Sequence, residues 1–300
     1  MNRQEIQLQP STLVQNPEAS SPSALTFEEF ANQPEYMEVN RGLIKRLFPH
    51  LPNRFFHVDI ATGTGLVPKL LMQQSQERGH KANIIGIDPN PISLEIARRT
   101  TPQSEEVDVL YLEGFGQDTE KLVHGKISSH GADSVSIHDA LHEIEGEENK
   151  NAVLIAMRNV LRPSGLFSFN SAFTTFGTEP NARVWGMWKL NALRLLQGKR
   201  DKEVTPIEFY TPEHYKKMVE SIGLVVVHEA KNVVNLTKDA LEGISRYPKF
   251  IEGAFGDMID QGKFTLEQKS QALIDALKGV EFMPRGWYEI IAQKPPVTIL

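Results

Sequence analysis

Short apolar runs alternate with amphipathic segments along most of the chain after residue 54. Between the runs, apolar positions recur at helical spacing in 67–78, 91–100, 149–161 and 211–222. The runs themselves have the length and composition of buried strands, at 54–60, 83–88, 107–112, 133–139, 165–170, 224–230 and 287–293. Strand–helix alternation of this kind predicts a doubly wound α/β fold, in which helices cover both faces of a mostly parallel sheet.

Three stretches interrupt this alternation and predict helical additions to one domain spanning residues 25–300. They are residues 25–50, 173–208 and 236–284. We expect them to cover the open edge of the sheet as a lid. Residues 1–24 are rich in Gln, Ser, Pro and Asn without an apolar period, so we expect a disordered tail there.

The composition narrows the class of protein. Apolar residues make up 40% of the chain, and 38 acidic against 32 basic side chains give a net charge of −6. No strongly basic face for nucleic acid is evident, and no apolar run approaches the ~18 residues of a membrane span. The absence of cysteine excludes disulfides, thiolate zinc sites and cysteine nucleophiles. Because the N-terminus has no apolar signal-peptide core, we expect a cytoplasmic protein; the oligomeric state stays open, a homodimer included.

A glycine turn follows the first predicted strand. The segment Asp59-x-Ala61-x-Gly63-x-Gly65 ends that strand and opens the next helix, which is the position where small residues let a ligand approach the backbone. A dinucleotide fingerprint needs a third glycine three residues after Gly65, but that residue is Pro68. The turn therefore lacks the third glycine that a pyrophosphate-binding site is expected to have.

Two carboxylates near this turn indicate a different ligand. Asp88 ends the second predicted strand, 29 residues after Asp59, and an acid at that position can accept both hydroxyls of a ribose. Asp59 can attract an ammonium group. Together they suit a nucleoside that carries a cationic amino-acid tail.

This set of motifs resembles that of class I S-adenosylmethionine (SAM)-dependent methyltransferases, over roughly residues 54–230 and the final strand. Ala61 stands where the family's first motif has glycine. The resemblance implies a Rossmann-like sheet of seven mostly parallel strands and SAM as the cofactor, bound by Asp59, Ala61, Gly63, Gly65 and Asp88. It further implies that Phe115 covers the adenine and Gln117 reads its amino group, and we place His138, at the end of the fourth strand, with these cofactor-binding residues.

The triplet Leu141-His142-Glu143 follows the fourth strand. It resembles an element of caffeic-acid-type O-methyltransferases, which implies that His142 deprotonates the accepting hydroxyl while Glu143 orients it. That family continues with tryptophan where this chain has Ile144.

Several alternatives stay open at this point. His142 could be a packing residue, and His138-Asp139-x-x-His142 mimics a zinc-binding helix, which would make the chain a metal hydrolase. An N- or C-methyltransferase would work by proximity without a dedicated base. A catalytically silent cofactor-binding module is the remaining alternative.

Aromatic residues in the additions are candidates for the acceptor pocket. Tyr36, Phe173, Trp185 and Trp188 are the residues we select, although aromatic residues at helical spacing also occur as plain core. The run 246–250 could contribute as well. Few cationic residues cluster in these stretches, so a small, largely apolar acceptor is favoured over nucleic acid.

Overall fold

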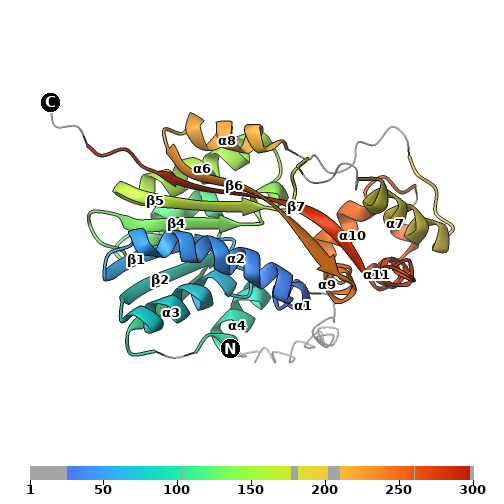
Figure 1. The fold of residues 1–300 in the computed structure, drawn as a ribbon, viewed down its shortest axis with the longest axis horizontal. Coiled ribbons are helices and arrows are strands. Elements are labelled where there is room, and N and C mark those ends of the chain that lie inside the picture. The colour runs from blue at the N-terminus through green and yellow to red at the C-terminus, as the bar shows by residue number, and fades with distance from the viewer. Residues whose placement is uncertain (1–25, 103, 177–181, 202–209, 260, 298–300) are drawn as a thin grey trace, which may run out of the picture.

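The computed structural model describes residues 26–102, 104–176, 182–201, 210–259 and 261–297. The predicted tail, residues 1–24, lies outside them. A single sheet of seven strands runs through the centre, in the order β3-β2-β1-β4-β5-β7-β6 (Figure 1). Its strands are β1 (Arg54–Ile60), β2 (Lys81–Asp88), β3 (Val107–Glu113), β4 (Ala132–His138), β5 (Leu161–Ser171), β6 (Val225–Thr237) and β7 (Phe282–Gln293). The first five strands pair in parallel, and β7 runs antiparallel between β5 and β6.

Helices cover both faces of this sheet, as the alternation predicted. On one face lie α2 (Pro34–Leu47), α3 (Leu66–Arg78) and α4 (Pro91–Thr100), which pack through two apolar clusters. On the other face lie α5 (Thr119–Val123), α6 (Glu147–Val160) and α8 (Pro212–Ser221), which pack against the inner strands. The predicted doubly wound, mostly parallel α/β fold is thereby confirmed.

The remaining helices form a cap with an apolar core of its own. They are α1 (Glu28–Ala31), α7 (Ala182–Leu195), α9 (Lys238–Ile244), α10 (Pro248–Ala254) and α11 (Leu266–Asp275). Their buried side chains pack with Tyr36 of α2 and with Leu236, Met283 and Trp287 from the ends of β6 and β7. Because β6 and β7 extend well past β5, they carry these helices beyond the end of the sheet (Figure 1).

The boundaries of the last addition differ from the expectation. Strand β6 ends at Thr237 and strand β7 begins at Phe282. The helical insert between them is therefore shorter than residues 236–284. The pattern over 237–254 divides into α9 and α10, because Pro248 opens α10 and holds Tyr247 in extended backbone, with a ψ of 117°.

The outer strand β6 alternates exposed with half-buried positions, as expected of an edge strand. Val225, Val227 and Val233 are each 55% exposed, and the charged Glu229 and Lys231 interrupt them.

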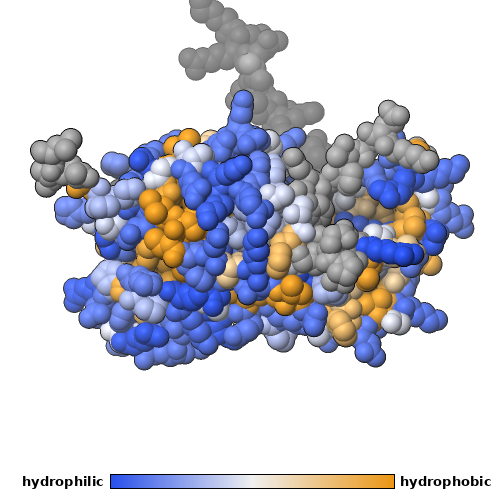
Figure 2. All heavy atoms as spheres, turned by 45° about the horizontal axis from the view of Figure 1, so that its top comes forward, coloured by the Kyte–Doolittle hydropathy of each residue, from blue (hydrophilic) through white to orange (hydrophobic). Residues whose placement is uncertain are grey.

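Most of the face in Figure 2 is hydrophilic, with apolar side chains gathered in separate places.

Candidate functional site

The turn between β1 and α3 uses left-handed backbone at three alternate residues. Ala61 and Gly63 have φ of 53°, and Gly65, the N-cap of α3, has φ of 83°. A Cβ on Gly65 would lie 2.5 Å from the hydroxyl of Tyr111, whereas a Cβ on Gly63 would meet nothing within 4 Å. Gly65 is therefore required by packing, while Gly63 borders open space. Ala61 adopts a conformation that costs an L-residue roughly 1–2 kcal/mol, so its replacement of the motif glycine carries a conformational cost.

Asp88 connects this turn to the end of β2. One carboxylate oxygen accepts the N–H of Gly63 at 2.8 Å, and the other accepts the N–H of Asn90 at 2.8 Å. Each oxygen retains a further lone pair for a ligand hydroxyl. Burial, the largest influence, raises the pKa of Asp88, although both backbone N–H groups oppose that shift.

Asp59 is buried at the end of a chain of hydrogen bonds. The Ser136 hydroxyl donates to Asp59 Oδ1 at 2.5 Å, so it must accept from His57 Nε2–H at 2.8 Å, and Ser134 then donates to His57 Nδ1 at 2.7 Å. Asp59 Oδ2 has no hydrogen-bond partner among the described residues. Burial raises the pKa of Asp59 to about 7. An unpaired carboxylate oxygen in this position is suited to a cationic ligand group.

Phe115 and Gln117 lie in the loop that follows β3, around a 3₁₀ turn at Gly116–Asp118. The loop is held beside the end of β2, because the N–H of Gly114 donates to the carbonyl of Asp88 at 3.1 Å. Both side chains are exposed, and 58% of Phe115 is accessible. An exposed phenyl ring on a loop that is hydrogen-bonded to Asp88 is available to cover a flat ligand group.

His138 belongs to a buried network that joins β4 to α2 and β5. Its Nδ1–H donates to Asn40 Oδ1 at 2.9 Å, an oxygen that also accepts from Asn170, and Ser168 donates to its Nε2 at 2.9 Å. Burial lowers the pKa of His138 to about 3. Both ring nitrogens are therefore engaged by protein groups, which differs from the cofactor contact expected of this residue. His138 ends a strand and His142 lies in a 3₁₀ turn, so the two imidazoles do not share a helical face as the zinc alternative requires.

His142 lies in the 3₁₀ turn Leu141–Glu143 that follows β4. Its buried ring stacks on Phe173, with centroids 3.6 Å apart and planes inclined by 14°. Burial, followed by the positive charges of Arg285 and Lys150, lowers the pKa of His142 well below its usual value. The imidazole is consequently neutral at neutral pH, and its Nδ1 has no hydrogen-bond partner among the described residues.

Glu143 is held by Tyr247 and not by His142. Both carboxylate oxygens lie 2.8 Å from the Tyr247 hydroxyl, which donates to them. The nearer oxygen is 3.9 Å from His142 Nε2, too far for a hydrogen bond but close enough for charge interaction. Burial raises the pKa of Glu143 to about 7.

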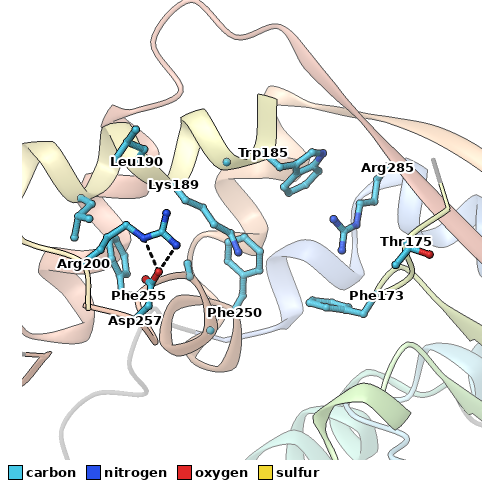
Figure 3. A pocket seen from close by; sticks show the side chains of 14 residues that line it. Phe173, Thr175, Trp185, Lys189, Leu190, Arg200, Phe250, Phe255, Asp257 and Arg285 are labelled. Atoms are coloured by element: carbon cyan, nitrogen blue, oxygen red, sulfur yellow. Dashed lines mark hydrogen bonds and ion pairs between the residues drawn. The ribbon is translucent and has the colours of Figure 1, made fainter. Parts of the chain in front are cut away.

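Two neighbouring cavities lie between the sheet and the cap, and Phe173, Phe250 and Gly253 border both. The smaller, about 220 Å³, is further lined by Phe27, Asp139, His142, Glu143, Ile244, Tyr247, Lys249 and Glu252. The larger, about 350 Å³ (Figure 3), is further lined by Thr175, Trp185, Gly186, Lys189, Leu190, Leu193, Arg200, Ala254, Phe255, Asp257 and Arg285. Cavities of this size and character suit small molecules.

The structure separates the four aromatic residues selected for the pocket. Phe173 borders both cavities and Trp185 lines the larger one, whereas Tyr36 and Trp188 line neither. Trp188 donates its indole N–H to the Leu273 carbonyl at 2.8 Å and stacks on Phe250 within the cap. Tyr36 is buried in an aromatic cluster with Phe27, Phe30 and Trp287.

Sequence reasoning missed the cationic residues of the larger cavity. Lys189 follows Trp185 by four residues, so both lie on one face of α7, a spacing visible in the sequence. Arg285 comes from β7, far later in the chain, and no local pattern connects it to α7. The expectation that few cationic residues gather at the acceptor pocket is therefore wrong for this cavity.

The comparisons with known proteins agree with this geometry. Residues 58–167 match the family model described as Methyltransferase domain, while a search of curated proteins finds no match. Three of the solved structures that share the fold illustrate this. A protein from Bacillus halodurans described as a candidate methyltransferase is 14% identical over 86% of this chain and 99% of its own, with a TM-score of 0.53. The cyclopropane synthase MmaA2 from Mycobacterium tuberculosis is 13% identical over 86% and 84%, with a TM-score of 0.53, and the YcgJ protein from Bacillus subtilis is 14% identical over 87% and 100%, with a TM-score of 0.51.

The match over residues 58–167 supports a methyltransferase that uses SAM as its cofactor. It agrees with the class indicated by the glycine turn and its two acids. No described helix has both the length and the apolar character needed to cross a membrane.

The residues at the turn fit this cofactor. Asp59 Oδ2 is buried and unpaired among the described residues, as expected of an atom that accepts from the ammonium group. The space in front of Gly63 is open to a ligand. Asp88 has lone pairs for the ribose hydroxyls, and Phe115 exposes its ring from the loop that is hydrogen-bonded to Asp88.

Proposed function

We propose that the protein transfers a methyl group from SAM to a hydroxyl oxygen of a small, largely apolar acceptor, with His142 as the general base. The observation that carries this proposal is a buried, neutral imidazole on the wall of the smaller cavity, directly after β4. In doubly wound sheets, ligands bind beyond the carboxyl ends of the strands, where His142 and the glycine turn both lie.

When bound, the cofactor supplies a methyl carbon that its sulfonium sulfur makes electrophilic. Asp59 and Asp88 would hold the ammonium and ribose ends, so that this carbon and the acceptor meet in a fixed orientation. The aromatic residues Phe27, Phe173 and Phe250 line the smaller cavity and would shield a bound acceptor from water.

His142 would take the hydroxyl proton as the oxygen becomes nucleophilic. The resulting imidazolium would be stabilised by the carboxylate of Glu143, 3.9 Å away. This help is needed, because burial and the nearby cations Arg285 and Lys150 oppose a positive charge on His142. The pair therefore works only where Glu143 is ionised, and the Tyr247 hydroxyl keeps that carboxylate in place.

The test begins with a panel of small alcohols, phenols, amines and carbon acids, screened for release of S-adenosylhomocysteine (SAH). With the acceptor found, His142→Gln should lower kcat by about 10²–10⁴-fold, the usual contribution of a general base, while SAH binds as in the wild type. Turnover of an amine or carbon acid that survives His142→Gln would overturn the hydroxyl assignment. If no compound were methylated although SAH bound, the protein would be a cofactor-binding module.

A further inference from the structure

The larger cavity combines aromatic walls with an excess of positive charge. Among the described residues that line it, Lys189, Arg200 and Arg285 are cationic and Asp257 is the acidic side chain. Asp257 pairs with Arg200 at one end of the cavity (Figure 3). Lys189 and Arg285 form a second cationic pair, at the end nearer Phe173.

Lys189 points into this cavity from α7. Its ammonium lies over the ring of Phe250 with 5.6 Å to the centroid, and it forms no hydrogen bond or ion pair with any residue that the structure describes. Burial and the positive charge of Arg285 lower the pKa of Lys189 to about 8. An ammonium in this setting gains stability from an anionic ligand.

Arg285 is held in place by aromatic rings. Its guanidinium lies 4.8 Å from the ring centroid of Trp185 and 5.2 Å from that of Phe173. The indole N–H of Trp185 donates to the carbonyl of Pro284 at 2.8 Å, which fixes α7 beside β7. Figure 3 shows the Arg285 and Lys189 head groups directed into the same space.

The ring of Phe173 separates this cationic pair from the proposed base. Arg285 approaches it at 5.2 Å, and His142 stacks on it with 3.6 Å between centroids. An acceptor that occupies both cavities would therefore have one end at His142 and the other at Lys189.

We infer that the acceptor is a small acid with an apolar body, whose carboxylate binds Lys189 and Arg285 in the larger cavity while its accepting atom faces His142 in the smaller one. This inference rests on the proposed function, since it names the substrate class of the same site. It also accounts for the aromatic lining, because Trp185 and Phe250 would contact the apolar body.

The experiment compares 3-phenylpropanoate with 3-phenylpropanamide, which differ in charge but hardly in shape. Titrations followed by ligand-observed NMR should show the carboxylate binding the wild-type protein about tenfold more tightly than the amide, the ratio expected for one charge-assisted contact. Lys189→Met should lower this ratio, because one of the two cations is lost, and should leave the affinity for the amide unchanged, because methionine keeps the apolar stem. Lys189→Arg should retain most of it.

Arg194→Met is the matched control, since it removes an exposed cation of α7 that lines neither cavity. It should leave the ratio as in the wild type. Equal affinities for the two probes in the wild type, parallel losses in Lys189→Met, or no binding of the carboxylate at millimolar concentration would each overturn the inference. A parallel SAH titration distinguishes failure of the proposed function from failure of this inference. Wild-type protein that binds no SAH would refute the proposed function, whereas the ratio of the two probe affinities tests the carboxylate site independently.

Discussion

Replacing Gly65 by alanine should destabilise the fold, whereas the same change at Gly63 should mainly weaken cofactor binding. A methyl group on Gly65 would lie 2.5 Å from the Tyr111 hydroxyl and 3.2 Å from Ala97 Cβ. A methyl group on Gly63 would meet no protein atom within 4 Å. The two glycines, one residue apart, therefore separate the packing role of the turn from its ligand role.

The magnitude for Gly65→Ala has two parts. A φ of 83° costs an alanine roughly 1–2 kcal/mol relative to glycine. The Tyr111 hydroxyl must also move away from Thr101, to which it donates at 2.6 Å, and the loss of this hydrogen bond costs about 1 kcal/mol. We expect the free energy of unfolding to fall by about 2–3 kcal/mol in total. Gly63→Ala has the backbone cost alone, about 1 kcal/mol.

Denaturant unfolding measures the stability of both variants, and calorimetric titration of SAH measures their affinity. Gly63→Ala should bind SAH at least about tenfold more weakly, because the added methyl group enters the space where the ligand approaches the backbone. The double variant Gly65→Ala/Tyr111→Phe removes the clashing hydroxyl and should lose less stability than the sum of the single variants. Strict additivity of that pair, or equal loss of stability at the two glycines, would refute the packing argument.

Three further predictions concern ionisable and strained residues. Because burial raises the pKa of Asp59 to about 7, the folded protein retains a proton there between about pH 4 and 7 that the unfolded chain releases. The unfolding free energy of the ligand-free protein should therefore fall as pH rises through that window. Asp59→Asn should remove this pH dependence and abolish SAH binding. A variant with the same pH profile as the wild type would show that Asp59 is not the titrating group. Glu143, whose pKa is raised to about 7, should make kcat rise with pH through that value, and a Glu143→Gln profile that kept the same inflection would exclude it as the source. Ala61→Gly relieves a strained φ of 53° but adds flexibility to the unfolded chain, and these two effects oppose each other. The unfolding free energy should therefore change by less than about 1 kcal/mol, and the affinity for SAH should be retained. A larger loss of stability would show that the Ala61 methyl group makes packing contacts in the folded protein.

Much of the fold could be read from local patterns, because buried strands and amphipathic helices have distinct periods. All seven strand segments occur, and the helix predicted over 91–100 has those bounds in the structure. The extension of β6 and β7 was missed, since outer positions such as Val233 and Lys231 are selected by pairing along an edge and not by burial. The break at Tyr247 has a local signal in the sequence, because Pro248 follows it.

The site also has a part that local sequence predicts and a part that it does not. Asp59, Gly63, Gly65 and Asp88 lie within one strand–turn–helix unit and the strand after it, where the order of residues sets their relative positions. The role of His138 could not be deduced locally, because its partner Asn40 lies 98 residues away.

The sequence by itself determined the class of fold and the cofactor end of the site, because hydrophobic period, turn chemistry and strand-end acids act over short stretches of chain. Tertiary structure alone decided the end of the site that we assign to the acceptor. It brings β7, α7 and the turn after β4 together, so that Arg285, Lys189 and Phe173 border one cavity. It also buries the His142 side chain and partly desolvates the Glu143 carboxyl, which shifts their pKa values in opposite directions. These properties depend on distance and dielectric environment between segments remote in sequence, which no local pattern records.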